Sequence, residues 1–448
     1  MNPIVIVFAG LTLFSLRKSP ESAVIDVLLP ALFLVPFAFA MHIPHLPTLT
    51  CIDAVLLLIG LASLATRPQL WKFQRADVWV IAFTLAAGYT DFINLGLQTA
   101  LFNFPSLACE IFFAYVVGKL LIEQGGHREK FAQRLVSMLA AVCVVSVAEF
   151  IAKKNIFLMF GRRFQSTGYV PDQMRGRFLR IKGPFAGPEQ AGIVLLLGIF
   201  LALWLFYLSR SRGSEPKYLG IRRSALLFLG IALGLYMTLS RGPWIGAVAG
   251  FLIARVGMVK NRRMAIVLAL ALATVGGVYA KVKTSQLAQI SADDMSLDES
   301  TSSAYYRTQL YTVYKPVAER GGLFGWSGSG YPRDPHLDSI DNEYILLWVA
   351  QGMVGLGLFI LIALESMIGI IRAIRKSRQR ADISLYYCLG GFLVGLLLVL
   401  ATVYLTAQGY VLFFMLAGWT QSLRDQSGGA EALSSVVPSR FTFKRVFA

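Results

Sequence analysis

The sequence has 448 residues, of which 56% are hydrophobic and only 15% are charged, a balance that excludes a water-soluble domain of ordinary composition. Its formal net charge of +17 would suit a nucleic-acid-binding protein, but the basic residues come in short clusters between hydrophobic runs, as orientation signals in membrane proteins do. The four cysteines are scattered in or beside hydrophobic runs without a CxxC pair, so we expect neither a disulfide framework nor a zinc site.

Apolar runs long enough to cross a bilayer recur along the whole chain. They predict an all-α, polytopic transmembrane helical bundle of about 12–13 spans, the first of which is short for a full crossing. The spans are expected at 2–16, 23–41, 48–66, 78–98, 103–122, 134–152, 186–208, 223–240, 242–258, 263–281, 344–371, 384–404 and 406–422.

Lysine and arginine clusters fall in alternate loops, which places those loops in the cytoplasm. The clusters lie at 17–18, 67–75, 128–134, 210–223, 260–263 and 372–380. Two long polar loops, 153–185 and 282–343, then lie on the opposite side, which in a bacterium is the periplasm. We therefore expect a multi-pass protein of the bacterial inner membrane with its polar loops facing the periplasm.

This reading divides the chain into alternating apolar and polar parts. They are N-terminal transmembrane helices (1–152), a basic periplasmic loop (153–185), central transmembrane helices (186–281), a large periplasmic loop (282–343), C-terminal transmembrane helices (344–422) and a flexible cytoplasmic tail (423–448).

The first long loop is basic although it is expected to be external, which breaks the charge rule that oriented it. Arg175 and Arg180 belong to this cluster, and arginine forks match phosphate oxygens. The loop therefore favours either a phosphate-bearing ligand or contact with anionic lipid headgroups.

Five carboxylates and one arginine are expected at the external ends of the spans. The carboxylates are Asp53, Asp91, Glu110, Glu149 and Glu189. Ionisable groups at such depth usually face a bundle interior or a wet cavity, although each could be an ordinary helix-end residue. Arg241 follows a span that ends near Ser240, and Pro243 suits the first turn of the next helix, so a tight turn holds Arg241 at the boundary. It could also simply snorkel to the interface.

The second long loop carries the richest set of polar groups. Arg307 lies on an expected amphipathic helix, and His336, Asp341, Asn342 and Glu343 precede the next span. Polar groups gathered at a membrane boundary predict a functional site, against the simpler reading of a solvated loop. Asp293 and Asp294 are expected on a solvated acidic face, and Pro44 between His42 and His45 disfavours a helical metal site there.

Three stretches together resemble the O-antigen ligase and polymerase superfamily of bacterial polysaccharide assembly. They are GPFAGPEQAGIVLLLG at 183–198, LSRGPWIG at 239–246, and the late loop from YYRTQLYTVYKPVAERGGLFGWSGSGY into DSIDNEYILLWVAQGMVGLGLF. Each motif is weak alone, but their order and spacing are more specific. The likeness covers about 183–365.

The resemblance implies a metal-independent, cofactor-free, inverting glycosyltransferase of the C-type membrane architecture. Members move a glycan from undecaprenyl pyrophosphate to an acceptor sugar or lipid-linked glycan on the periplasmic side. Carried over by position, Arg241 and Arg307 would hold the pyrophosphate. Asp341 stands where ligases most often carry histidine, which favours a polymerase of exopolysaccharide or O-antigen repeats over a ligase. Partners would be membrane lipid and possible polysaccharide-assembly proteins, without nucleic acid.

The residues read on their own agree with this chemistry. Positioned arginines stabilise a departing pyrophosphate without a metal, and Arg175, Arg180 and Asn342 are further candidates for substrate binding. A general base must accept the proton of the attacking hydroxyl, and Asp341 is preferred over His336 and Glu343.

Two other classes compete with the transferase. A transporter or flippase of a lipid-linked or anionic substrate would also need intramembrane carboxylates and basic loops. It should, however, carry polar or broken helices near the bilayer midplane, whereas polarity here gathers on one side. A structural subunit of an assembly complex would not need an arginine-rich external loop.

Overall fold

The computed structural model describes residues 3–36, 39–41, 47–123, 126–161, 172–213, 216–218, 221–259, 299–335, 337 and 339–434. The expected span at 263–281, and the residues His42, His45, Asp293, Asp294 and His336, lie outside the described residues. Within the described part the chain is helical apart from loops and three two-stranded antiparallel pairs, β1–β2, β3–β4 and β5–β6. The prediction of an all-α bundle is confirmed.

The chain up to Gly161 forms short helices and three long helical runs. Its elements are α1 (Pro3–Leu16), α2 (Pro20–Ala23), the π-helix η1 (Val24–Leu28), α3 (Leu29–Phe33), β1 (Ala40–Met41), β2 (Leu49–Thr50), α4 (Cys51–Thr66), the 3₁₀ turn η2 (Pro68–Leu70), α5 (Arg75–Leu95), α6 (Leu97–Ala108), the π-helix η3 (Cys109–Phe113), α7 (Ala114–Leu121), α8 (Arg128–Ala152) and α9 (Ile156–Gly161).

The chain from Met174 onward carries the segments expected to bear the site. Its elements are β3 (Met174–Arg175), β4 (Phe178–Leu179), α10 (Pro188–Arg212), β5 (Lys217–Tyr218), β6 (Ile221–Arg222), α11 (Arg223–Met237), α12 (Arg241–Met258), α14 (Glu299–Arg320), α15 (Glu343–Lys376), α16 (Arg380–Leu400) and α17 (Ala407–Ser434). α17 continues past residue 422, where its span was expected to end.

The expected span at 23–41 is only partly helical. Its helical run stops at Phe33, and Ala40 and Met41 pair as a strand with Thr50 and Leu49. Pro36 explains the early stop, because a proline has no amide hydrogen to donate and disfavours the helical conformation in the residue before it.

Six helices in the described part are long and apolar enough to cross a bilayer. They are Arg75–Leu95, Leu97–Leu121, Arg128–Ala152, Pro188–Arg212, Glu343–Lys376 and Arg380–Leu400. The apolar helices Pro3–Leu16, Cys51–Thr66 and Arg223–Met237 are shorter. This is the architecture of a multi-pass helical membrane protein.

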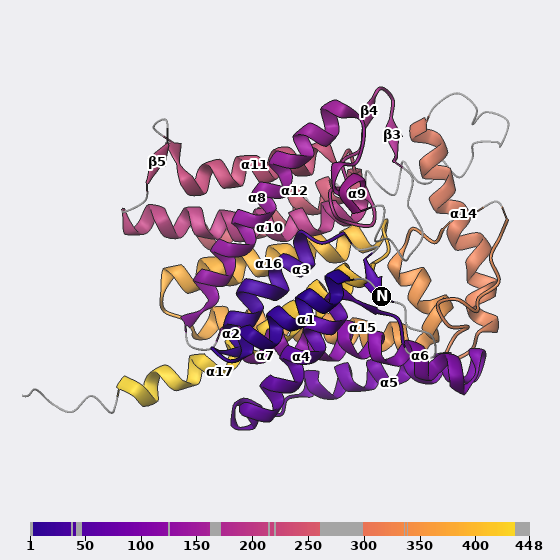
Figure 1. Cartoon of the computed structure of the whole chain (residues 1–448), viewed down its shortest axis with the longest axis horizontal. Helices are drawn as coiled ribbons and strands as arrows, with labels where there is room; N and C mark the ends of the chain where they lie inside the picture. Colours follow the sequence, from indigo (N-terminus) through magenta and orange to yellow (C-terminus); the bar gives the residue numbers. More distant parts are fainter. Residues whose placement is uncertain are drawn as a thin grey trace, which may run out of the picture.

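Most of these helices run side by side along the long axis of the molecule, while α14 lies at one end and crosses their direction (Figure 1). Of the six long apolar helices, α10 is the most enclosed. Within the protein, 89% of its most apolar stretch is buried. α14 packs through a separate small core against α15 and the preceding loop. Its members are Leu310, Tyr314, Val317, Ala318, Leu337, Ile340 and Val349.

Glycines bring α12 and α16 into backbone contact. A Cβ added to Gly246 would lie 2.6 Å from the carbonyl oxygen of Gly395, and one added to Gly250 would lie 2.3 Å from that of Gly391. Both helices thus present glycines four residues apart to each other, the pattern that lets membrane helices approach closely. This contact fixes α16 against the helix that begins with Arg241.

We expect Gly250→Ala to destabilise the bundle, because the new methyl group would collide with the Gly391 carbonyl and the Phe200 ring. Overpacking of this kind costs about 1–3 kcal/mol. The melting temperature in detergent measures it. Gly230→Ala in α11 is the control, since a Cβ there meets no atom within 4 Å. Equal melting temperatures for the two variants would contradict this account of the packing.

Candidate functional site

The first wall of the site is the turn between α11 and α12. It contains only Thr238, Leu239 and Ser240, as the tight turn expected from the sequence requires. Leu239 has φ +50°, in the left-handed region that β-unbranched residues also seldom adopt. The turn leaves Arg241 as the first residue of α12, with its side chain exposed.

Two arginines of the basic loop hold this turn. The Arg175 guanidinium donates to the carbonyl oxygen of Leu239. Arg180 donates from Nε to the Thr238 carbonyl oxygen at 3.3 Å and from Nη2 to the Ser240 Oγ at 2.8 Å. The loop therefore folds back over the bundle, and its β3–β4 hairpin lies near the end where α14 lies (Figure 1). Arg175 and Arg180 are thus neighbours of Arg241, and their bonds position its turn.

Arg180 also joins this wall to α10. It forms an ion pair with Glu189 in the first turn of α10, and its Nη1 donates to the Gln173 Oε1 at 2.7 Å. Pro188 at the start of α10 suits a first helical turn, which fixes the direction in which Glu189 leaves the helix. One guanidinium therefore links the hairpin, α10 and the α11–α12 turn.

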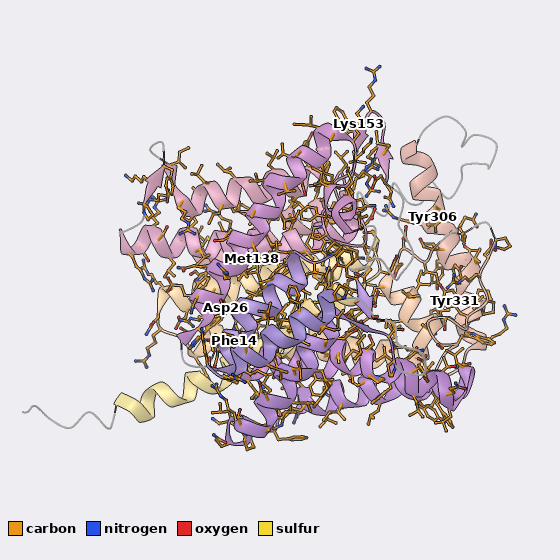
Figure 2. The ribbon with its side chains drawn as sticks, viewed as in Figure 1. Phe14, Asp26, Met138, Lys153, Tyr306 and Tyr331 are labelled. Atoms are coloured by element: carbon orange, nitrogen blue, oxygen red, sulfur yellow. The ribbon has the colours of Figure 1, made fainter. Side chains whose placement is uncertain are left out.

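The opposite wall is α14, which carries Arg307. The hydroxyl of its neighbour Tyr306 donates to the Ser339 carbonyl oxygen at 2.5 Å, and the Ser339 amide donates back to that hydroxyl at 3.2 Å. These bonds tie α14 to the segment that leads into α15. Figure 2 shows Tyr306 and Tyr331 together on the α14 side of the molecule.

Asp341 lies in that segment, two residues before α15 begins. Its Oδ1 accepts a hydrogen bond from the Ser339 Oγ at 2.6 Å. Burial raises the pKa of Asp341 above that of a free aspartate, and the Ser339 bond lowers it. Three charges act further, since Glu189 raises this pKa while Arg307 and Arg180 lower it.

The charges of the same groups act on Arg307, whose side chain is partly exposed on α14. Burial lowers the pKa of its guanidinium, the nearby Asp341 raises it, Arg241 lowers it and Glu189 raises it. An arginine remains charged at neutral pH despite such effects. The charges of Arg180, Glu189, Arg241, Arg307 and Asp341, from five separate segments, therefore act on one another. We call these five residues the arginine–carboxylate cluster.

Within the cluster, Arg180 is paired with Glu189, whereas Arg241 and Arg307 are unpaired among the described residues. In the described part of the chain, neither guanidinium forms a hydrogen bond or an ion pair within 4 Å. By contrast, Lys119 pairs with Asp77 at 2.7 Å, and Arg128 pairs with Glu123 at 2.9 Å. Two unpaired guanidiniums whose charges act on each other are well suited to an anion with two charged groups.

Asn342 and Glu343 hold the backbone around Asp341. The Asn342 side chain caps α15 by accepting from the Ile345 amide at 3.1 Å and donates to the Ala401 carbonyl at 2.9 Å. The fully buried Glu343 accepts from the Leu405 amide at 2.7 Å and the Tyr410 hydroxyl at 2.6 Å. Their expected roles in substrate binding and as a base stay predictions, and these bonds favour Asp341 over Glu343.

The other predicted carboxylates lie in separate hydrogen-bonding networks. Asp53 accepts from the Thr50 amide at 2.9 Å and the Ser106 Oγ at 3.0 Å, and that hydroxyl also lies 3.3 Å from Glu110. Glu149 accepts from the Lys182 and Gly183 amides, each at 3.1 Å. Of the five carboxylates expected at the external ends of the spans, Glu189 is the one that belongs to the arginine–carboxylate cluster.

Asp91 has a structural role of a different kind. It accepts from the Ser327 Oγ at 2.6 Å and the Asn103 Nδ2 at 2.9 Å. Ser327 belongs to the glycine-rich loop after α14, whose backbone pairs with α15 through Trp326 N to Val349 O at 3.0 Å. Asp91 therefore holds the loop that connects α14 to Asp341.

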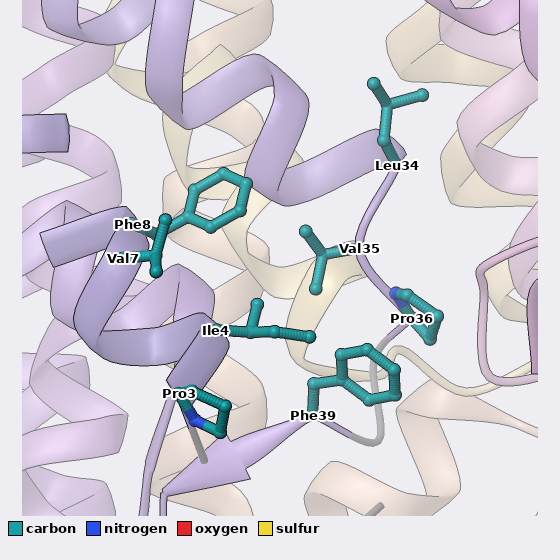
Figure 3. Close-up of a pocket in the computed structure, with 8 residues that line it drawn as sticks. All are labelled: Pro3, Ile4, Val7, Phe8, Leu34, Val35, Pro36 and Phe39. Carbon is teal, nitrogen blue, oxygen red and sulfur yellow. The ribbon is translucent and has the colours of Figure 1, made fainter. Parts of the chain in front are cut away.

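An apolar cavity of about 350 Å³ lies apart from these charges, between α1 and the segment after α3 (Figure 3). Its lining is Pro3, Ile4, Val7, Phe8, Leu34, Val35, Pro36 and Phe39. Without polar side chains it has no group for acid–base chemistry. In the described residues, no three His, Cys, Asp or Glu side chains come close enough to hold a metal ion.

Fold and site together define a multi-pass helical membrane protein with a cationic and acidic site at one end of its bundle. Residues 224–360 match the family model for O-antigen ligase. The chain therefore carries an O-antigen ligase family domain, and the resemblance seen in the sequence is confirmed. The matched stretch contains Arg241, Arg307 and Asp341. No curated protein matches the chain. This domain supports a ligase- or polymerase-type function in surface polysaccharide assembly.

The segment between α16 and α17 was not expected from the sequence. Residues 401–406 are not helical, although two spans were expected to meet there. Tyr404 of this segment lies in the field of Asp341 and Glu189. The polar residues Thr402, Tyr404 and Thr406 between two apolar runs were the signal for this break.

Proposed function

We propose that this protein transfers a glycan from undecaprenyl pyrophosphate to an acceptor sugar on the periplasmic side of the bacterial inner membrane, and that it polymerises repeat units. The observation that carries the proposal is the pair of unpaired guanidiniums, Arg241 and Arg307, beside Asp341. Two fixed cations match a diphosphate, and the adjacent carboxylate matches a hydroxyl that must lose its proton.

The reaction needs two events at one carbon atom. The acceptor hydroxyl oxygen forms a bond with the anomeric carbon of the donor while its proton passes to the Asp341 carboxylate. The bond from that carbon to the phosphate oxygen breaks, and its electron pair leaves with the pyrophosphate. Attack opposite to the leaving group inverts the anomeric centre. Arg241 and Arg307 stabilise the charge that develops on the pyrophosphate.

Arg175 and the remaining residues of the cluster, Arg180 and Glu189, keep this geometry. Arg175 and Arg180 hold the turn that carries Arg241, and Glu189 holds Arg180. Positioned donors accelerate a reaction because they need no reorganisation when charge develops. Metal independence is part of the proposal, since two arginines supply the positive charge that a metal would otherwise provide.

We expect Arg307→Ala in the source bacterium to abolish long surface glycans, because removing one such electrostatic donor typically costs about 10²–10³-fold in rate. The glycan pattern on a gel measures the effect. A polymerase should leave single repeat units, whereas a ligase should leave untransferred lipid-linked glycan. Lys315→Ala is the control, because Lys315 lies on the same helix and pairs with the exposed Glu319 at 3.9 Å. An unchanged ladder with normal Arg307→Ala expression would contradict both activities.

The alternative is a transporter or flippase of a lipid-linked or anionic substrate. Purified protein in detergent separates the two, because detergent micelles have no second side to which a substrate could move. Glycan chains that lengthen in micelles supplied with lipid-linked repeat units would support the transferase. Flipping in vesicles without lengthening in micelles would support the transporter.

A further inference from the structure

The non-helical segment 401–406 contacts the direct sequence neighbours of three cluster residues. Next to Asp341, Asn342 donates to the Ala401 carbonyl at 2.9 Å, and Glu343 accepts from the Leu405 amide at 2.7 Å. The segment is therefore tied at both ends to the start of α15. Its position relative to Asp341 is fixed by side chains that are themselves anchored.

The same segment is tied to α10 and α12. Next to Glu189, the Gln190 side chain donates to the Tyr404 carbonyl and accepts from the Thr406 Oγ1 at 3.2 Å. Next to Arg241, Gly242 packs so closely that an added Cβ would lie 2.5 Å from the Thr402 Oγ1. The segment therefore lies against the starts of α10, α12 and α15, which carry or adjoin residues of the cluster.

Tyr404 is the aromatic residue at the middle of this segment. Burial raises the pKa of its phenol, and Asp341 and Glu189 raise it further. Its backbone is bound by Gln190, but its hydroxyl forms no hydrogen bond with the residues that the structure describes. A half-buried phenol, on a backbone tied to the residue next to Glu189, is thus left available for a ligand.

Tyr331 approaches from the loop after α14. Its ring packs edge-on against Tyr314, with the ring centroids 6.2 Å apart, and the Arg333 guanidinium lies 5.5 Å from its centroid. Its hydroxyl also raises the pKa of Tyr404, after the effects of burial and the two carboxylates. Tyr331 therefore supplies a second phenol, from the α14 side, whose charge acts on Tyr404.

We propose that Tyr404, assisted by Tyr331, forms the binding site for the acceptor sugar. This inference rests on the proposed transfer reaction and adds where its neutral substrate lies. A sugar ring presents apolar C–H groups and several hydroxyls, so it needs an aromatic surface together with hydrogen-bond acceptors and donors. The two phenols supply the rings and donors, and Asp341 and Glu189 supply acceptors. The arginines remain for the diphosphate.

The test measures sugar binding and diphosphate binding separately on the purified full-length chain in detergent. The sugar probe is a set of oligosaccharides released by mild acid from the surface polysaccharide of the source bacterium, and the anion probe is inorganic pyrophosphate. We expect Tyr404→Ala to weaken oligosaccharide binding about ten-fold, the size of a lost hydrogen bond with a lost apolar contact. Pyrophosphate binding should not change, which also shows that the variant is folded.

Two further variants complete the test. Arg307→Ala should weaken pyrophosphate binding and leave oligosaccharide binding intact. Tyr344→Phe is the matched control, because its hydroxyl donates to the Leu397 carbonyl at 2.7 Å and is already occupied within the bundle. Should Tyr404→Ala fail to fold, Tyr404→Phe should bind the oligosaccharides more weakly than Tyr344→Phe.

The outcomes separate the two proposals. Equal oligosaccharide affinity in wild type and in a folded Tyr404→Ala variant would overturn the acceptor site, whatever the pyrophosphate result. If Tyr404→Phe is the only folded variant, equal affinity with Tyr344→Phe would overturn it too. Wild-type protein that does not bind pyrophosphate would overturn the proposed reaction. Loss of both ligands on Tyr404→Ala, with an unchanged melting temperature, would also contradict a site devoted to the sugar.

Discussion

Asp341→Asn should slow glycan transfer by about 10²–10⁴-fold, because a positioned general base contributes that much to a reaction of this kind. Asparagine keeps the size of the side chain and can still accept the Ser339 hydrogen bond, but it cannot take up a proton. The measurement is the rate at which purified protein extends lipid-linked repeat units. Asp341→His should retain part of the rate, since imidazole can also act as a base.

The matched control is Asp26→Asn. Asp26 is exposed in η1, away from the α14 side where Tyr306 and Tyr331 lie (Figure 2). It should leave the rate unchanged. A rate loss for Asp341→Asn of less than about three-fold, in a variant of normal stability, would exclude Asp341 as the base and leave His336 as the next candidate.

The pH dependence of the rate tests the same assignment. A base works only when ionised, and burial raises the pKa of Asp341 above that of a free aspartate. The rate should therefore fall as pH is lowered through this raised pKa, sooner than for an unperturbed aspartate. Because Arg307 lowers the pKa of Asp341, the residual activity of Arg307→Ala should be lost at a higher pH still. The ratio kcat/KM against pH measures both.

The helix α15 is kinked at Gly352, where the backbone leaves the helical conformation. Gly352→Ala should destabilise the protein by about 1–3 kcal/mol through backbone strain alone, because φ +66° and ψ −167° lie in a region used almost only by glycine. The new Cβ would also lie 2.2 Å from the Leu323 carbonyl oxygen. The glycine-rich loop after α14 would have to leave α15, with loss of the bond from Val354 N to Leu323 O at 3.0 Å.

Thermal unfolding in detergent and limited proteolysis measure this effect. The melting temperature should fall, and cleavage within residues 321–327 should become faster. Gly357→Ala is the control, because it lies in the same helix, has no positive φ and meets no atom within 4 Å of an added Cβ. Similar behaviour of the two variants would show that the kink at Gly352 does not hold the loop.

The apolar runs and the residues at their ends were enough to predict much of the bundle. The run before Ser240 and Pro243 after it located the α11–α12 turn correctly, since both signals are local. The amphipathic pattern around Arg307 also predicted a helix, which the structure extends over Glu299–Arg320. Local patterns identified which charged residues lie near the ends of helices.

Which of these residues meet depends on long-range packing, which local patterns do not contain. Asp91 and Glu149 were grouped with Glu189 as carboxylates at the external ends of spans, yet each bonds to a different loop. Tyr404 was hidden because Val403 and Leu405 keep the hydropathy high through a segment that is not helical. Only the anchors at Gln190 and Glu343, distant in sequence, show why the chain turns there.

The glycine contact between α12 and α16 limits how this protein could change its substrate range. With backbones touching at Gly246 and Gly395, and again at Gly250 and Gly391, the distance between the two helices cannot be adjusted by exchanging side chains. Arg241 is the first residue of α12, and Tyr404 follows shortly after the end of α16, where Gly242 packs against Thr402. A longer or bulkier sugar therefore has to be accommodated by trimming residues on the α14 wall, and engineering for new glycans should begin there.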